Sequence, residues 1–230
     1  MTSKLIHKVI PVGFLQCNCS ILADPEAREA IVVDPGDEAD VILEILRQDH
    51  LKVRAIVSTH THIDHVGGLA KLHRATGAPV LIHRDDLHLY STVETQAKWI
   101  GVPTPEIAQI DEFLKEGDAL RWGGFVARVL HTPGHTQGSI CLVVEPGVAP
   151  HAHDAAPAHR HTPTARRLLA GDTLFQGSIG RTDLPGGSYP QIIKSIHEKL
   201  LVLPDDMVVI PGHGETTTIG EERAHNPFLR

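Results

Sequence analysis

The 230-residue sequence is long enough to bury one sizeable hydrophobic core and shows no need for a second unit, so we expect a single domain over residues 1–230. Its formal net charge is -7, it has no Lys/Arg-rich run, and only 4% of its residues are aromatic, which argues against a nucleic-acid partner. No stretch approaches the ~20 apolar residues of a membrane span, and the N-terminus lacks the apolar core of a signal peptide. We therefore expect a cytoplasmic protein without a membrane partner.

The first third of the chain alternates apolar runs with turn signals. Three apolar segments predict strands that form an antiparallel sheet edge, at residues 4–12, 17–23 and 30–33. The third segment ends in Asp34-Pro35-Gly36, where Asp34 either completes a turn or orients the loop that follows the next strand. Apolar residues at helical spacing then predict a helix from about residue 38 to residue 48.

The three cysteines, Cys17, Cys19 and Cys141, are odd in number and show no disulfide framework, so we expect reduced thiols. One asparagine separates Cys17 from Cys19. A metal or redox pair is one interpretation of this spacing, but its apolar setting favours strand packing.

A histidine-rich stretch, Thr59-His60-Thr61-His62-Ile63-Asp64-His65, follows an apolar strand at residues 53–57. Side chains two apart on an extended chain point the same way, so His60 and His62 can hold one ion, while Asp64 and His65 can face a second position. Imidazole and carboxylate ligands suit zinc, iron or manganese. Four such groups exceed what one tetrahedral ion takes from so tight a loop, which keeps two metals open. The alternative is a polar surface loop. Residues 66–69, which contain two glycines, begin a predicted helix through Arg74 and let the backbone pass close to a bound ion, which favours a metal site.

The rest of the chain contains further apolar strands and two helical regions. We predict strands at residues 79–82, 125–130, 139–144, 168–170 and 206–210, and helices at residues 84–100 and 189–201. His83, His88 and His131 lie at or near the ends of these elements, and we assign them structural or surface roles rather than ligation.

Residues 146–167 interrupt this pattern. They are rich in proline and alanine and contain four histidines, His151, His153, His159 and His161. The segment has few apolar side chains to bury, which is typical of a flexible insertion. We favour a solvated loop over weak metal binding by its histidines.

Four apolar strands each lead into a potential ligand. The strand at residues 53–57 precedes the His60 loop, and the strands at 125–130, 168–170 and 206–210 precede His135, Asp172 and His213. Near-continuous apolar strands belong to sheets covered on both faces, and loops at strand ends carry chemistry on a rigid base. Four such junctions in one chain favour a common site.

In these motifs the sequence resembles the metallo-β-lactamase superfamily, and within it the glyoxalase II (hydroxyacylglutathione hydrolase)-like proteins. The resemblance rests on five segments in the family's order, residues 60–65, 132–136, 171–173, 180–183 and 211–214. It implies an α/β fold, a four-layer αββα sandwich of two mixed sheets flanked by helices. It further implies two divalent metal ions, zinc by preference and iron or manganese otherwise. One metal would take His60, His62 and His135, the other Asp64, His65 and His213, with Asp172 bridging.

The resemblance also implies a thioester hydrolase for a small-molecule substrate such as an S-2-hydroxyacylglutathione. A metal-bridging hydroxide would attack, with Asp64 accepting its hydrogen bond. Arg181 either holds a substrate carboxylate or pairs with Asp183. Full-length glyoxalase II proteins have a C-terminal helical region that helps bind glutathione, whereas 17 residues follow His213, so the thiol stays open.

Three other functions remain as alternatives. The first is a mononuclear iron persulfide dioxygenase that uses His60, His135 and Asp172, since a related branch shares the Gly-Arg-Thr-Asp motif at residues 180–183. The second is a lactone or β-lactam hydrolase on the same metal core. The third is a non-catalytic metal-binding module that uses the insertion. The sequence leaves the oligomeric state open.

Overall fold

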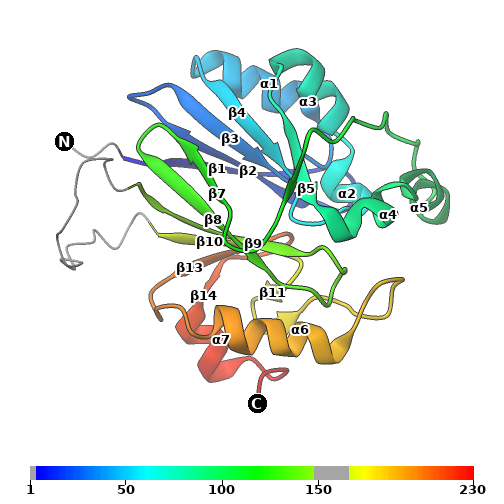
Figure 1. Ribbon diagram of the computed structural model, residues 1–230, viewed down its shortest axis with the longest axis vertical. Helices are drawn as coiled ribbons and strands as arrows, with labels where there is room; N and C mark the ends of the chain where they lie inside the picture. The colour runs from blue at the N-terminus through cyan, green and yellow to red at the C-terminus, as the bar shows by residue number, and fades with distance from the viewer. Residues whose placement is uncertain (1–3, 148–165) are drawn as a thin grey trace.

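The computed structural model describes residues 4–147 and 166–230. Two mixed six-stranded sheets face each other, and helices cover their outer faces (Figure 1). The predicted four-layer αββα architecture is therefore confirmed. Residues 148–165 of the predicted insertion lie outside the described residues, so the solvated loop stays a prediction.

The first sheet has the strand order β1-β2-β3-β4-β5-β6. Its antiparallel part is the predicted edge, formed by β1 (Ile6–Val12), β2 (Cys17–Asp24) and β3 (Glu29–Val33). Its parallel part adds β4 (Lys52–Val57), β5 (Val80–His83) and β6 (Glu112–Leu114). Parallel neighbours need crossover connections, which here run through α1 (Ala39–Gln48) and α3 (Leu69–Thr76).

The second sheet has the order β14-β13-β10-β9-β8-β7. Its strands are β7 (Ala119–Trp122), β8 (Phe125–His131), β9 (Ile140–Pro146), β10 (Arg167–Gly171), β13 (Val208–Pro211) and β14 (Thr217–Thr218). Only β10 and β13 run parallel in this sheet. A short hairpin of β11 (Leu174–Phe175) and β12 (Ser178–Ile179) follows β10.

Three apolar layers hold the four structural layers together. Ile42 of α1, Leu69 of α3 and Val93 of α5 (Val93–Ile100) pack on the outer face of the first sheet. Side chains such as Trp122 and Phe125 fill the space between the sheets. On the other side, α6 (Tyr189–Ser195), the π-helical turn η3 (Ile196–Leu200) and α7 (Ile219–His225) cover the second sheet. Each sheet is thus buried on both faces, which explains its near-continuous apolar strands.

Short elements account for the differences from the predictions. The helical region at residues 84–100 forms three pieces, a 3₁₀ turn η1 (Arg84–Asp86), α4 (Leu87–Tyr90) and α5. Asp64 and His65 lie in a single helical turn, α2 (Ile63–Val66). Strands β6, β7, β11, β12 and β14 and helix α7 were not predicted, because two to seven residues carry too little periodicity. Among the described residues, no helix is long and apolar enough to cross a membrane.

Candidate metal centre

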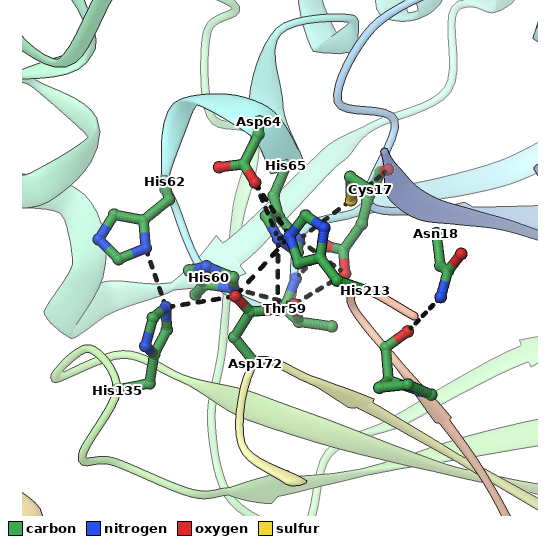
Figure 2. Close-up of polar contacts among 12 residues, drawn as sticks. Cys17, Asn18, Thr59, His60, His62, Asp64, His65, His135, Asp172 and His213 are labelled. Atoms are coloured by element: carbon green, nitrogen blue, oxygen red, sulfur yellow. Dashed lines mark hydrogen bonds and ion pairs between the residues drawn. The ribbon is translucent and has the colours of Figure 1, made fainter. Parts of the chain in front are cut away.

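The structure brings all seven predicted ligands together at one edge of the sandwich (Figure 2). They come from four segments, which follow strands β4, β8, β10 and β13. The ends of these strands meet at the same edge. Helix α2 completes the set by turning two side chains back toward the strand ends. The residues are His60, His62, Asp64, His65, His135, Asp172 and His213.

His60, His62 and His135 form the first group of ligand atoms. One nitrogen from each ring lies within 4.8 Å of the others. His62 Nδ1 is 2.9 Å from His135 Nε2, and His60 Nε2 is buried without a hydrogen-bond partner. Three imidazole nitrogens that face one another across a small space suit one cation.

Asp64, His65 and His213 form the second group. His213 Nε2 is 3.0 Å from Asp64 Oδ2 and 3.3 Å from His65 Nε2. His65 Nε2 is 3.7 Å from the same Asp64 oxygen. Two imidazoles and a carboxylate around one point suit a second divalent cation.

Asp172 lies between the two groups and faces both. Its Oδ1 is 3.5 Å from His65 Nε2, and its Oδ2 is 3.6 Å from His135 Nε2 and 3.8 Å from His213 Nε2. Oδ1 is buried without a hydrogen-bond partner. The backbone of Gly212 passes so close that a Cβ there would overlap this oxygen, which explains the glycine beside His213.

The outward nitrogens of four of the histidines have their own partners. His135 Nδ1 is 2.8 Å from the Arg181 carbonyl, and His213 Nδ1 is 2.9 Å from the Leu15 carbonyl. In the same way, His65 Nδ1 faces Asp34 at 3.2 Å and His60 Nδ1 faces the Thr59 hydroxyl at 3.2 Å. A carbonyl or carboxylate on Nδ1 fixes its proton there and leaves Nε2 free to bind a metal.

Asp34 orients the histidine loop, which settles the alternative that the sequence left open. Its Oδ1 accepts a 2.7 Å hydrogen bond from the Thr59 backbone, and its Oδ2 accepts one of 2.8 Å from the Thr59 hydroxyl. The same Oδ2 faces His65 Nδ1. Asp34 is 3% exposed, so these bonds are shielded from water.

Cys17, Asn18 and Cys19 pack beneath the centre at the start of β2. Burial raises the pKa of the Cys17 thiol to about 12, so it stays a thiol although its Sγ is 3.5 Å from His65 Nδ1. The packing interpretation fits Cys19, which is fully buried. Asn18 has a role that the sequence did not indicate, since its Nδ2 donates 3.0 Å hydrogen bonds to the Pro211 and Gly214 carbonyls on either side of His213.

Asp86 is a further buried acid near the centre, and the sequence did not indicate its role. Its carboxylate accepts hydrogen bonds from the Thr61 backbone at 2.9 Å, the Thr136 hydroxyl at 3.0 Å and the Gly138 backbone at 2.6 Å. It therefore joins the loop that carries His60 and His62 to the loop that carries His135. Asp86 follows β5 without any motif, so only the structure could reveal this role.

Burial and neighbouring charges set the protonation states of the candidate ligands. Burial lowers the pKa of His60 well below the usual imidazole value and that of His62 to about 3, which leaves both rings neutral. Burial opposes a charge on Asp64, but the positive charge of His65 and the hydrogen bond from His213 lower its pKa further than burial raises it. Burial likewise opposes a charge on His65, yet the acidic groups around it raise its pKa. His65 must therefore lose a proton when a cation binds.

A cavity of about 980 Å³ opens over the centre. His62, Asp64, His135, Asp172 and His213 line it, so both ligand groups are accessible to a small molecule. Arg181 also lines the cavity, and its guanidinium makes two 2.8 Å hydrogen bonds with the Asp183 carboxylate. The local pair is thus present, and a substrate carboxylate remains a predicted partner for Arg181.

His83, His88 and His131 lie outside the centre, as the sequence indicated. The rings of His83 and His131 stack with centroids 3.9 Å apart and planes 13° apart. His83 Nδ1 accepts a 3.2 Å hydrogen bond from the Asp85 backbone, and His131 Nε2 is 2.8 Å from the Gln137 carbonyl. His88 is exposed and lines the cavity.

Comparisons with known proteins agree with this geometry. The family model of the metallo-β-lactamase superfamily matches residues 12–148 and 143–213. An uncharacterised protein from Aquifex aeolicus is 44% identical, covering 97% of each chain. Hydroxyacylglutathione hydrolase GloC from Haemophilus influenzae is 38% identical, covering 96% of this chain and 97% of that protein.

Solved structures show the same fold. The B3 metallo-β-lactamase BLEG-1 has a TM-score of 0.81 at 35% identity, covering 97% of this chain and 99% of that one. TTHA1623 in a di-iron-bound form has a TM-score of 0.79 at 35% identity, covering 96% and 100%. ETHE1 from Myxococcus xanthus has a TM-score of 0.73 at 26% identity, covering 96% and 83%. We conclude that this chain belongs to the metallo-β-lactamase superfamily and is a hydrolase that uses divalent metal ions.

Proposed function

We propose that the protein is a dinuclear metal-dependent hydrolase of thioesters, with S-2-hydroxyacyl derivatives of a small thiol as substrates and zinc as the metal. The observation that carries this proposal is the position of Asp172, whose carboxylate faces both ligand groups beneath one cavity. His60, His62 and His135 would hold one ion, and Asp64, His65 and His213 the other. The relative from Haemophilus influenzae, a hydroxyacylglutathione hydrolase by name, supports the substrate class.

Each part of the reaction has a residue to serve it. Divalent cations supply Lewis acidity, which polarises an acyl carbonyl and lowers the pKa of water from 15.7 to about 7. Asp64 lines the cavity with a carboxylate that its surroundings keep ionised, so it can accept a hydrogen bond from the attacking water and direct a lone pair toward the acyl carbon. Asp34 and the Leu15 and Arg181 carbonyls hold the imidazoles in place during turnover.

A thiol leaving group explains why no separate general acid is needed. A thiol has a pKa of about 8.5, so the thiolate departs readily at neutral pH. A carboxylate on the substrate would interact with Arg181, whose guanidinium is 60% exposed at the cavity and could exchange Asp183 for a substrate oxygen.

The test combines metal analysis with turnover. Metal-free protein is reconstituted with zinc, manganese or iron, and we expect two ions per chain together with release of free thiol from S-lactoylglutathione. Asp172→Asn should lose at least one ion and about 100-fold in turnover. Asp206→Asn, at an exposed position away from the cavity, is the matched control and should match wild type.

The experiment must also distinguish the thioester hydrolase from a mononuclear iron persulfide dioxygenase, which is the alternative function. Oxygen uptake with glutathione persulfide is therefore measured on the same preparations. One iron per chain, persulfide-dependent oxygen uptake and no thioester turnover would refute the hydrolase and establish the alternative.

A further inference from the structure

A large part of the lining of the cavity over the metal centre is apolar. It is built from three separate segments, with Leu15 from the turn between β1 and β2, Leu89, Trp99 and Ile100 from α4 and α5, and Leu184 and Pro185 from the loop after Asp183. We call these six residues the apolar wall. Trp99 is 68% exposed, Ile100 45% and Leu15 43%, although all three are large apolar side chains. Such side chains gathered at the mouth of a cavity are typical of a ligand-binding surface.

The apolar wall continues beyond the metal centre. A second cavity of about 340 Å³ shares Leu15 and Ile100 with the first and adds Phe14 and Val102. Phe14 is 84% exposed. An extended group that starts at the metal centre can therefore contact further apolar side chains beyond the main cavity.

Away from the metal ligands, the lining of the main cavity offers few cationic partners to a substrate carboxylate. Of the acidic lining residues, Asp64 and Asp172 would have their charge offset by the bound cations and Asp86 is 1% exposed, which leaves Asp85. Among the described lining residues, Arg181 is the one basic side chain of the lysine or arginine type. The Arg181 guanidinium is already paired with Asp183. Glutathione carries two carboxylates, so its peptide part finds few partners, whereas an uncharged apolar group is complementary to the apolar wall.

We propose that the preferred substrates are thioesters with an aliphatic or aryl group that packs on the apolar wall, with Trp99 as the main contact. This inference rests on the proposed thioester hydrolysis. The apolar group belongs either to the acyl part or to the thiol part of the substrate. Burial of the group and of the exposed Trp99 ring lowers the free energy of the bound state in either case.

Turnover distinguishes the two sources of the apolar group. S-hexanoylglutathione carries it on the acyl part, the S-lactoyl ester of hexanethiol carries it on the thiol part, and S-lactoylglutathione lacks it. We expect at least one of the first two to exceed S-lactoylglutathione by about tenfold in kcat/KM, the factor that about two buried methylenes provide. Trp99→Ala should remove this preference, and Trp99→Phe should retain it.

Binding provides a readout that does not depend on turnover. Two thioethers, S-hexylglutathione and S-methylglutathione, differ only in apolar length, and we expect the hexyl compound to bind about tenfold more tightly by calorimetry. Binding of the hexyl compound should also change the tryptophan fluorescence. The change reports Trp99, because Trp122 is 1% exposed in the core and does not contact the ligand. Phe228→Ala removes another exposed aromatic side chain, 45% exposed and outside both cavities, so this control should bind like wild type.

The outcomes separate this inference from the proposed function. Equal binding of the two thioethers, with S-lactoylglutathione hydrolysed as well as both apolar esters, would overturn the inference and leave the thioester hydrolase standing. Tighter, Trp99-dependent binding of the hexyl compound without hydrolysis of any thioester would support the apolar wall as a ligand site and refute the hydrolase.

Discussion

Asp34→Asn tests whether a residue outside the ligand set controls the metal centre. Asn keeps the size of Asp and tolerates the left-handed backbone at this position, where φ is 53°. Its carbonyl oxygen can still accept the hydrogen bond from the Thr59 backbone. Its amide group then replaces Oδ2 and faces His65 Nδ1, so the imidazole loses its charged acceptor.

The expected loss of metal affinity is worked from the contact with His65, while the Thr59 hydroxyl also loses Oδ2 as its acceptor. A hydrogen bond to a charged group contributes about 1.5–3 kcal/mol. The distance of 3.2 Å from Asp34 Oδ2 to His65 Nδ1 is at the long end for such a bond, so we expect about 1.5–2 kcal/mol. That free energy corresponds to a decrease of about 10- to 30-fold in metal affinity. The loss should fall on the ion held by Asp64, His65 and His213, because His60 contacts Asp34 only through Thr59.

Zinc titration against a chromophoric chelator measures the two affinities separately. Asp40→Asn is the control, since Asp40 lies on α1 with a 79% exposed side chain. Two affinities equal to those of wild type would refute the role given to Asp34. An equal loss at both positions would show that Asp34 acts through Thr59 rather than through His65.

Three further measurements test the centre and the fold. In Gly212→Ala the new Cβ would overlap Asp172 Oδ1, so we expect loss of bound metal and of turnover. The control Gly124→Ala, where the added Cβ has more room, should retain both. Equal metal content in the two variants would contradict this expectation. Chelation of the metals should lower the melting temperature by about 10 °C, since ligands of the folded state stabilise it, and an unchanged melting temperature would argue against metal binding. Burial and the charge of Arg167 lower the pKa of His7 from 6.5 to about 4, so between these values the unfolded chain binds more protons and the folded state loses stability as the pH falls. In metal-free protein, urea denaturation should therefore show a free energy of unfolding that decreases between pH 7 and pH 5. The decrease should be smaller in His7→Gln by at most about 2 kcal/mol, and an identical decrease in both proteins would refute this assignment.

The sequence predicted the elements with strong periodicity and the ligands that directly follow them. Strand β4 is a near-continuous apolar run and the helix α1 before it repeats with a spacing of 3.6 residues, so their ends could be placed within a residue or two. His60, His62 and His65 were identifiable because they are close together in the chain. His135, Asp172 and His213 were identifiable because each follows an apolar strand, and ends of neighbouring strands meet in space.

The sequence by itself thus indicated the fold class through the order of its family motifs, and it indicated the candidate ligands through polar residues that follow apolar strands at short spacings. Only the tertiary structure decided which groups support them. Asp34 contacts Thr59 across 25 positions and Asp86 contacts Thr136 across 50, and no local pattern records such pairs. The apolar wall arises in the same way, because Leu15 and Trp99 share one cavity only after the chain has folded.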